Sequence, residues 1–78
     1  MATYRFTQFN VDLVDPTFYA VSAEYVVGQP EVKIYATLET PDSKLYGVEL
    51  GTMANTDTWG DDEVMNQAIT ELETHRID

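Results

Sequence analysis

Residues 31–40 read EVKIYATLET, and this segment sets the architecture that the rest of the chain must satisfy. Apolar and polar side chains alternate along it, which is the two-residue period of a strand with one buried face and one solvated face. The side chains expected to point inward are Val32, Ile34, Ala36 and Leu38. Those expected to point outward are Lys33, Tyr35, Thr37 and Glu39. A strand of this kind is typical of an antiparallel sheet covered on one side.

Three further runs have the same period, and they cover residues 4–14, 18–27 and 44–50. Turn-forming residues separate the runs, and connections this short join antiparallel neighbours. In the second run the expected inward set is Tyr19, Val21, Ala23, Tyr25 and Val27. In the fourth run it is Tyr46, Val48 and Leu50.

Residues 61–76 have a helical period instead. The apolar stripe of this expected helix consists of Val64, Met65, Ala68, Ile69 and Leu72. Acidic residues fill the first turn, and His75 and Arg76 are expected in the last turn, so both ends complement the helix dipole. Gly60 is the expected N-cap.

The order of these elements predicts an α+β fold over a single domain, residues 1–78. We expect a four-stranded antiparallel meander sheet with one C-terminal helix packed on one face (ββββα). The helix stripe and the inward strand faces must cover each other because neither is stable in water. An alternative topology places the first strand at an edge, beside the fourth.

Matching the inward faces sets a register that pairs Leu13 with Tyr19, Val27 with Val32, and Leu38 with Tyr46. On the outer face this register produces a row of Gln8, Glu24, Tyr35 and Glu49. An apolar patch is expected beside that row, formed by Tyr4, Phe6 and Val26. A bulge near Thr7 is the alternative, since it would turn Tyr4 and Phe6 inward.

The charge is strongly one-sided, with 14 acidic residues against 4 Lys and Arg and a formal net charge of −10. Direct binding to nucleic acid needs cations that neutralise phosphates, so we expect none. Binding to an anionic membrane surface is disfavoured for the same reason. A basic protein surface is the partner that such a charge favours.

The beginning of the sequence has neither the basic region nor the apolar run of a signal peptide, so the expected location is the cytoplasm. No segment has the roughly 20 apolar residues of a membrane span. Cysteine is absent, which excludes disulfides and thiolate metal sites.

No motif for catalysis or for a cofactor is found. The only histidine, His75, is expected at the helix end, and no sequence signature accompanies a nucleophile, so we expect no enzyme and no cofactor. Residues 55–66 partly resemble a calcium-binding EF-hand loop, but Asn66 stands where the bidentate glutamate belongs. The sequence therefore favours an acidic helix start over a metal site.

These observations favour a non-enzymatic module that binds a basic protein through its acidic surface. Mimicry of a nucleic acid, which would inhibit a nucleic-acid-handling protein, is one form of this function. The candidate protein-binding residues are Phe6, Glu24, Val26, Tyr35, Glu49, Asp57, Asp61, Asp62 and Glu63. The alternative is a small structural or assembly subunit, such as a homodimer, that self-associates through the outer sheet face.

Overall fold

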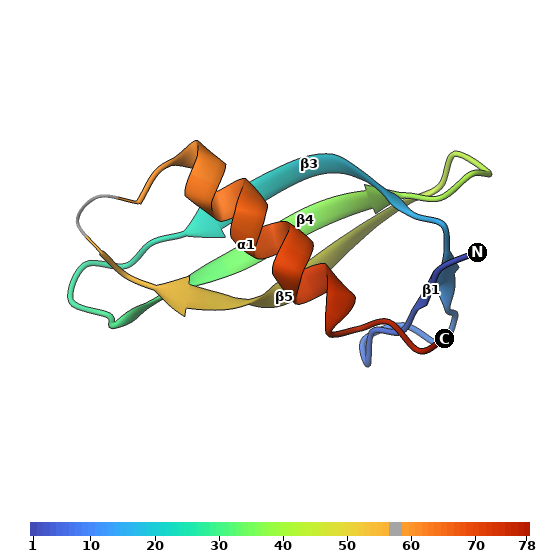
Figure 1. Ribbon diagram of the computed structural model, residues 1–78, viewed down its shortest axis with the longest axis horizontal. Coiled ribbons are helices and arrows are strands. Elements are labelled where there is room, and N and C mark those ends of the chain that lie inside the picture. The colour runs from blue at the N-terminus through green and yellow to red at the C-terminus, as the bar shows by residue number, and fades with distance from the viewer. Residues whose placement is uncertain (57–58) are drawn as a thin grey trace.

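The computed structural model describes residues 1–56 and 59–78, which form two small antiparallel sheets and one helix (Figure 1). Its elements are β1 (Thr3–Tyr4), β2 (Leu13–Val14), β3 (Thr17–Glu24), β4 (Glu31–Glu39), β5 (Leu45–Ala54) and α1 (Asp61–Glu73). Strands β3, β4 and β5 form an antiparallel meander, and β1 pairs with β2 in a separate two-stranded sheet. The expected α+β fold with a C-terminal helix is confirmed, whereas the single four-stranded sheet is wrong.

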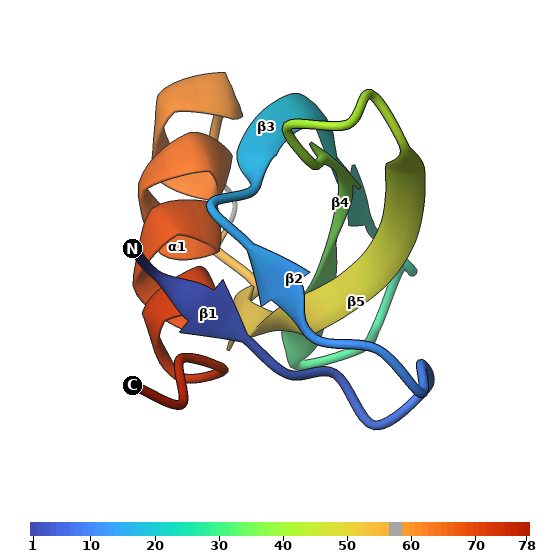
Figure 2. The same ribbon diagram turned by 90° about the vertical axis from the view of Figure 1, so that its right-hand side faces the viewer.

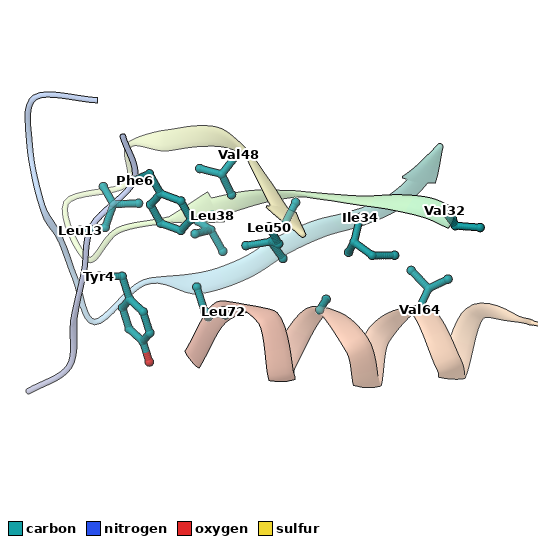
Figure 3. Close-up of a cluster of buried hydrophobic side chains, with 12 residues drawn as sticks. Tyr4, Phe6, Leu13, Val32, Ile34, Leu38, Val48, Leu50, Val64 and Leu72 are labelled. Carbon is teal, nitrogen blue, oxygen red and sulfur yellow. The ribbon is translucent and has the colours of Figure 1, made fainter. Parts of the chain in front are cut away.

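The first expected strand is broken because the helix is too short to cover the sheet. The 13 residues of α1 reach about 20 Å, whereas the 10 residues of β5 span about 33 Å. The N-terminal segment covers the remaining apolar surface with Tyr4, Phe6 and Leu13 (Figure 3). Burying these three side chains stabilises the arrangement, because it removes their apolar surface from water.

Tyr4 and Phe6 were expected on the outer face, and that placement was wrong. They are only 6% and 1% exposed, on the same side of the sheet as α1. The alternative expectation, that both side chains turn inward, is therefore confirmed. The two side chains turn inward because the strand is interrupted after Tyr4, and not because of a bulge near Thr7.

The inward sets expected for β4 and β5 are confirmed. All four apolar residues of β4 are buried, Val48 and Leu50 are buried on β5, and Tyr46 is half-buried. The helix adds Val64, Ala68 and Leu72 to this core. Figure 3 shows Val64 and Leu72 pointing from the helix toward the sheet. The core thus lies between the sheet on one side and two covering pieces, the helix and the N-terminal segment, on the other.

Strand β3 departs from the expected pattern. Its register against β4 shifts between Phe18 and Ala20, so Tyr19 is 64% exposed while Val21 and Ala23 keep half-buried positions toward the core. The strand ends at Glu24, and the residues that follow it form an exposed loop. The expected burial of Tyr19, Tyr25 and Val27 was therefore wrong.

Two of the three expected cross-strand pairs were wrong as well. Leu13 lies opposite Tyr4 rather than Tyr19. Strand β3 ends at the pair of Glu24 and Lys33, so Val27 has no place opposite Val32. The third pair, Leu38 with Tyr46, is confirmed.

The helix begins where expected, with Gly60 as an N-cap in extended conformation, but it ends at Glu73. His75 and Arg76 lie beyond its last turn, so the expected basic last turn is wrong. Met65 and Ile69, expected in the buried stripe, are 40% and 50% exposed. The buried residues recur every four positions, which leaves these two on a flank of the helix.

The two ends of the chain lie together at one end of the molecule (Figures 1 and 2). Beyond α1, the backbone N–H of Ile77 donates to the carbonyl of Thr3 at 3.0 Å, and that of Arg5 donates to the carbonyl of His75 at 2.9 Å. The C-terminal segment therefore fastens the N-terminal segment over the core. Within residues 1–56 and 59–78, no helix is both long and apolar enough to cross a membrane.

Candidate functional site

The outer face of the three-stranded sheet is the candidate site, because α1 and the N-terminal segment cover only the opposite face (Figure 2). Strand β4 runs through its centre and presents the odd-numbered residues that follow from the alternation of buried positions. On β3 the partners of Thr37 and Tyr35 are the small residues Ala20 and Ser22, and on β5 Gly47 and Glu49 share this face.

A shallow depression of about 360 Å³ lies in the middle of this face. Ala20 and Ser22 have small side chains and Gly47 has only a hydrogen, so these residues leave space beside the larger ring of Tyr35. Gln8 is at the rim, where its Nε2 donates to the carbonyl of Gly47 at 3.2 Å. The depression can therefore accept a side chain of a partner with Tyr35 as its aromatic wall.

Two carboxylates lie near Tyr35. Glu49 is its cross-strand neighbour on β5, as expected. On β3 the neighbour is Ser22, while Glu24 lies opposite Lys33. The expected row was wrong at β3 because the register of β3 against β4 differs by two residues from the expected one, which puts Ser22 opposite Tyr35 in place of Glu24.

The electrostatics of Tyr35 reflect this setting. Desolvation of the hydroxyl raises the pKa of Tyr35 above its ordinary value of 10.0, and the negative charges of Glu24 and Glu49 raise it further. The positive charge of Lys33 acts in the opposite direction. The phenol thus stays neutral at physiological pH and senses both carboxylates.

A second depression, of about 300 Å³, adjoins Glu24 at the end of β3. Val26, Glu31 and Lys33 contribute to its lining, and Val26 is 49% exposed. Glu31 accepts a hydrogen bond of 2.7 Å from the hydroxyl of Thr52. The structure therefore brings Glu24 and Val26 together, as the sequence suggested, and adds Glu31 to them.

Phe6 does not belong to this face, because it is buried in the core. Asp61, Asp62 and Glu63 are exposed in the first turn of α1. Asp57 lies outside the described residues. Trp59, just before the helix, contacts the ring of Tyr25 with centroids 6.0 Å apart, so the helix start adjoins the loop that follows β3.

Charge is unevenly distributed along the molecule. The chain termini and the turn at residues 40–44 lie at one end in Figure 1, and their cations form ion pairs with nearby carboxylates. These pairs join Arg5 to Asp12 at 2.9 Å, Lys44 to Asp42 at 3.7 Å, and Arg76 to Asp78 at 3.0 Å. The other end carries Glu24, Glu31 and the acidic helix start with Lys33 as its one described cation.

The contacts of His75 join separate parts of the fold. Its ring stacks on Phe6, and its nitrogens lie 3.3 Å from the carbonyl oxygen of Arg5 and 3.0 Å from that of Leu50. In either tautomer one N–H donates to a backbone carbonyl. Among the residues that the structure describes, no three potential metal ligands of the His, Cys, Asp and Glu types come together.

Sequence reasoning missed the small residues that shape the depression. Ala20, Ser22 and Gly47 belong to no recognisable sequence motif, and only the register brings them around Tyr35. A glycine in mid-strand was the available signal, since it often marks a close approach by another group. Comparison with protein-family models, with curated proteins and with solved structures finds no match, so the site is interpreted from its own geometry.

Proposed function

We propose that the protein is a non-enzymatic binding module whose outer sheet face takes up a basic region of another protein. The observation that carries this proposal is the depression around Tyr35, which has Glu24 and Glu49 beside it on an otherwise uncovered sheet. A lysine or arginine side chain of the partner fits its dimensions and its charge.

Recognition would combine two interactions. A cation above the ring of Tyr35 gains about 0.5–1 kcal/mol at an exposed site. The two carboxylates supply partners for the same cation, and an arginine can satisfy a carboxylate through two parallel hydrogen bonds. Neighbouring side chains of the partner would reach Val26 in the adjoining depression.

The net charge supports the approach of such a partner. A charge of −10 on 78 residues steers a basic surface toward the protein, and this effect weakens with added salt. Three of the four cations are engaged in ion pairs at the end that holds the termini, so they offset little of the acidity near Glu24 and Glu31. Inhibition of a nucleic-acid-handling protein by mimicry of phosphates is one outcome of this chemistry.

Self-association through the outer face, the alternative function, rested on an apolar patch of Tyr4, Phe6 and Val26. Two members of that patch are buried, which leaves Val26 without them on this face. The acidic depression is the feature that remains, and it favours a basic partner.

The test compares the wild type with a Glu24→Gln/Tyr35→Ala/Glu49→Gln variant as bait in an extract of the source cells. A retained protein supports the proposal if it is basic, if the variant releases it, and if raised salt weakens its affinity in a titration with purified components. A lysine- and arginine-rich synthetic peptide provides a second probe, monitored through the amide resonances of Ser22, Tyr35 and Gly47.

The matched control is Asp61→Asn/Asp62→Asn, which removes the same number of carboxylates from the helix start. We expect this control to retain most of the binding. Loss of binding in the control alone would assign recognition to the helix start and contradict the outer-face proposal. Binding that is indifferent to salt would contradict its electrostatic basis.

A further inference from the structure

The two edge strands of the three-stranded sheet, β5 and β3, differ in how far other parts of the chain hydrogen-bond to their outer sides. On the free side of β5, Gln8 donates to the carbonyl of Gly47 and His75 lies 3.0 Å from the carbonyl oxygen of Leu50. Strand β3 has β4 on one side, and none of its eight residues is buried. Its register shift lies between Phe18 and Ala20, and the residues from Ala20 to Glu24 include neither the lysine nor the proline with which proteins often protect an edge.

The register shows which backbone groups of β3 face the open side. In an antiparallel sheet both polar groups of a residue point to the same neighbour, and the direction alternates along the strand. The carbonyl of Gly47 points away from β4. The backbone groups of its partner on β4, Thr37, therefore point to β3, where Thr37 pairs with Ala20. Alternation then directs the N–H and C=O groups of Val21 and Ala23 outward. No hydrogen bond from the described residues reaches these groups.

An exposed apolar flank of α1 lies beside this edge. The side chain of Glu71 lies over Gly51 of β5, which fixes the rotation of the helix. Glu71 precedes the buried Leu72 by one residue, whereas Met65 and Ile69 each follow a buried residue by one. At 100° per residue these positions are on opposite flanks, so Met65 and Ile69 lie on the β3 side.

We propose that β3 is a self-association edge, which pairs antiparallel with β3 of a second copy and joins two sheets into one. A two-fold axis at Ser22 places Val21 of each copy opposite Ala23 of the other. Both residues then exchange the hydrogen bonds that their outward backbone groups lack. Met65 and Ile69 of the two helices approach each other over the new strand pair and bury the exposed flank.

Charge selects a second copy over a basic segment as the occupant. Strand β3 carries one charged residue, Glu24, so the strand itself bears little charge on a chain with a net charge of −10. In the two-fold arrangement the two Glu24 residues lie four positions apart, or about 14 Å, which exceeds the screening length of about 8 Å. The repulsion between the two Glu24 residues is therefore small, while Asp62 beside Met65 on the flank of α1 adds a repulsion that salt screens. Strand β3 itself offers a basic strand only Glu24 as a carboxylate.

This inference stands apart from the proposed function. The outer face, with Tyr35 and Glu49, stays free on both copies, and the dimer places two such faces on one sheet. Added salt also acts in opposite directions. It screens the repulsion between two acidic copies and favours the dimer, whereas it weakens the binding of a basic partner.

The experiment measures the mass of the purified chain by sedimentation equilibrium, from low micromolar to near-millimolar concentration. We expect the mass to rise toward twice the 8.8 kDa of one chain and the amides of Val21 and Ala23 to become protected from hydrogen exchange. Ile69→Glu places two further anions at the interface between two acidic copies and should shift the dissociation constant at least tenfold toward the monomer. Val11→Glu is the matched control, because it makes the same change in net charge at a distant loop where Val11 is 52% exposed, and it should dimerise nearly as the wild type does.

Ala23→Pro tests the backbone pairing itself. It removes an N–H that points to the open side, so the fold, checked by circular dichroism, should persist while the dimer is lost. A wild type that stays monomeric over the whole range would overturn the inference. A dimer that survives Ile69→Glu, or one that Val11→Glu disrupts equally, would also overturn it. None of these outcomes bears on the basic partner, which is absent from the experiment.

Discussion

The ring of Phe6 stacks on the ring of His75, with centroids 4.4 Å apart and 26° between their planes. This contact joins the segment that covers half of the core to the segment that follows the helix. The His75 ring also bridges the backbone carbonyls of Arg5 and Leu50. The N-terminal segment, the C-terminal segment and β5 therefore meet at one point.

We predict that Phe6→Ala destabilises the protein by about 3–5 kcal/mol, because it leaves a cavity where a 1%-exposed aromatic ring fills the core. A small domain has a total stability of about 5–15 kcal/mol, so much of the variant would be unfolded. Urea unfolding followed by Trp59 fluorescence measures the change. Tyr19→Ala is the control, since its ring is 64% exposed, and a comparable loss in the control would contradict the assigned core.

We predict that His75→Ala loosens the N-terminal segment more than the sheet. The change removes a hydrogen bond of about 1 kcal/mol together with the stacking on Phe6, which adds about 0.5–1.5 kcal/mol. Hydrogen exchange should accelerate first at the amides of residues 3–14, with β4 still protected. Equal acceleration in both regions would indicate that His75 supports the whole fold instead.

We predict a pH-dependent role for Asp78. Its carboxylate accepts hydrogen bonds from the Arg76 side chain and from the backbone N–H of Thr3, and both lower its pKa below the ordinary 3.8. A lowered pKa in the folded state gives stability that is present above the ordinary value and is lost as the pH falls through the folded value. Asp78→Asn should thus unfold more easily than the wild type at pH 7.

Thermal unfolding across the acid range checks this prediction. The difference between the wild type and Asp78→Asn should shrink as the pH falls below the ordinary value of 3.8, and it should vanish below the pKa of the folded state, where the wild-type carboxylate is protonated too. Glu49→Gln makes the same change in net charge without touching this contact, so it serves as the control. A difference that persists unchanged in acid would exclude the ionised carboxylate as its source.

We predict that Glu24→Gln lowers the pKa of Tyr35 and that Lys33→Gln raises it, because the two charges act on the phenol in opposite directions. Titration of the Tyr35 ring carbons by NMR provides the measurement. Glu63→Gln, at the helix start, should leave the titration curve in place. Shifts of one sign in both variants would show that the phenol responds to packing rather than to these charges.

The central strand and the helix could be predicted because each carries its own period. Val32 to Leu38 alternate without interruption, and both neighbouring strands bury the same face, so no other orientation of β4 is stable. The first strand could not be identified in this way. The fate of Tyr4 and Phe6 depends on how far the helix reaches along the sheet, which is a comparison between distant elements.

The candidate site was predictable only in part. Tyr35 and Glu49 follow from the register of the β4–β5 hairpin, whose short turn leaves little freedom. The position of Glu24 depends on the shift after Phe18 and on the early end of β3, and local sequence marks neither. The position of the small residues around Tyr35 depends on the same shift, because Ala20 and Ser22 belong to β3.

The hydrogen bond between Ile77 and Thr3 has a practical consequence. Polypeptide joined to the chain before Thr3 and after Ile77 would therefore leave the domain at two neighbouring points. The whole unit is therefore suited to insertion into a surface loop of a host protein, with minimal spacers and no stretching of the host. Cyclisation by a short peptide across the same gap should likewise leave its architecture intact.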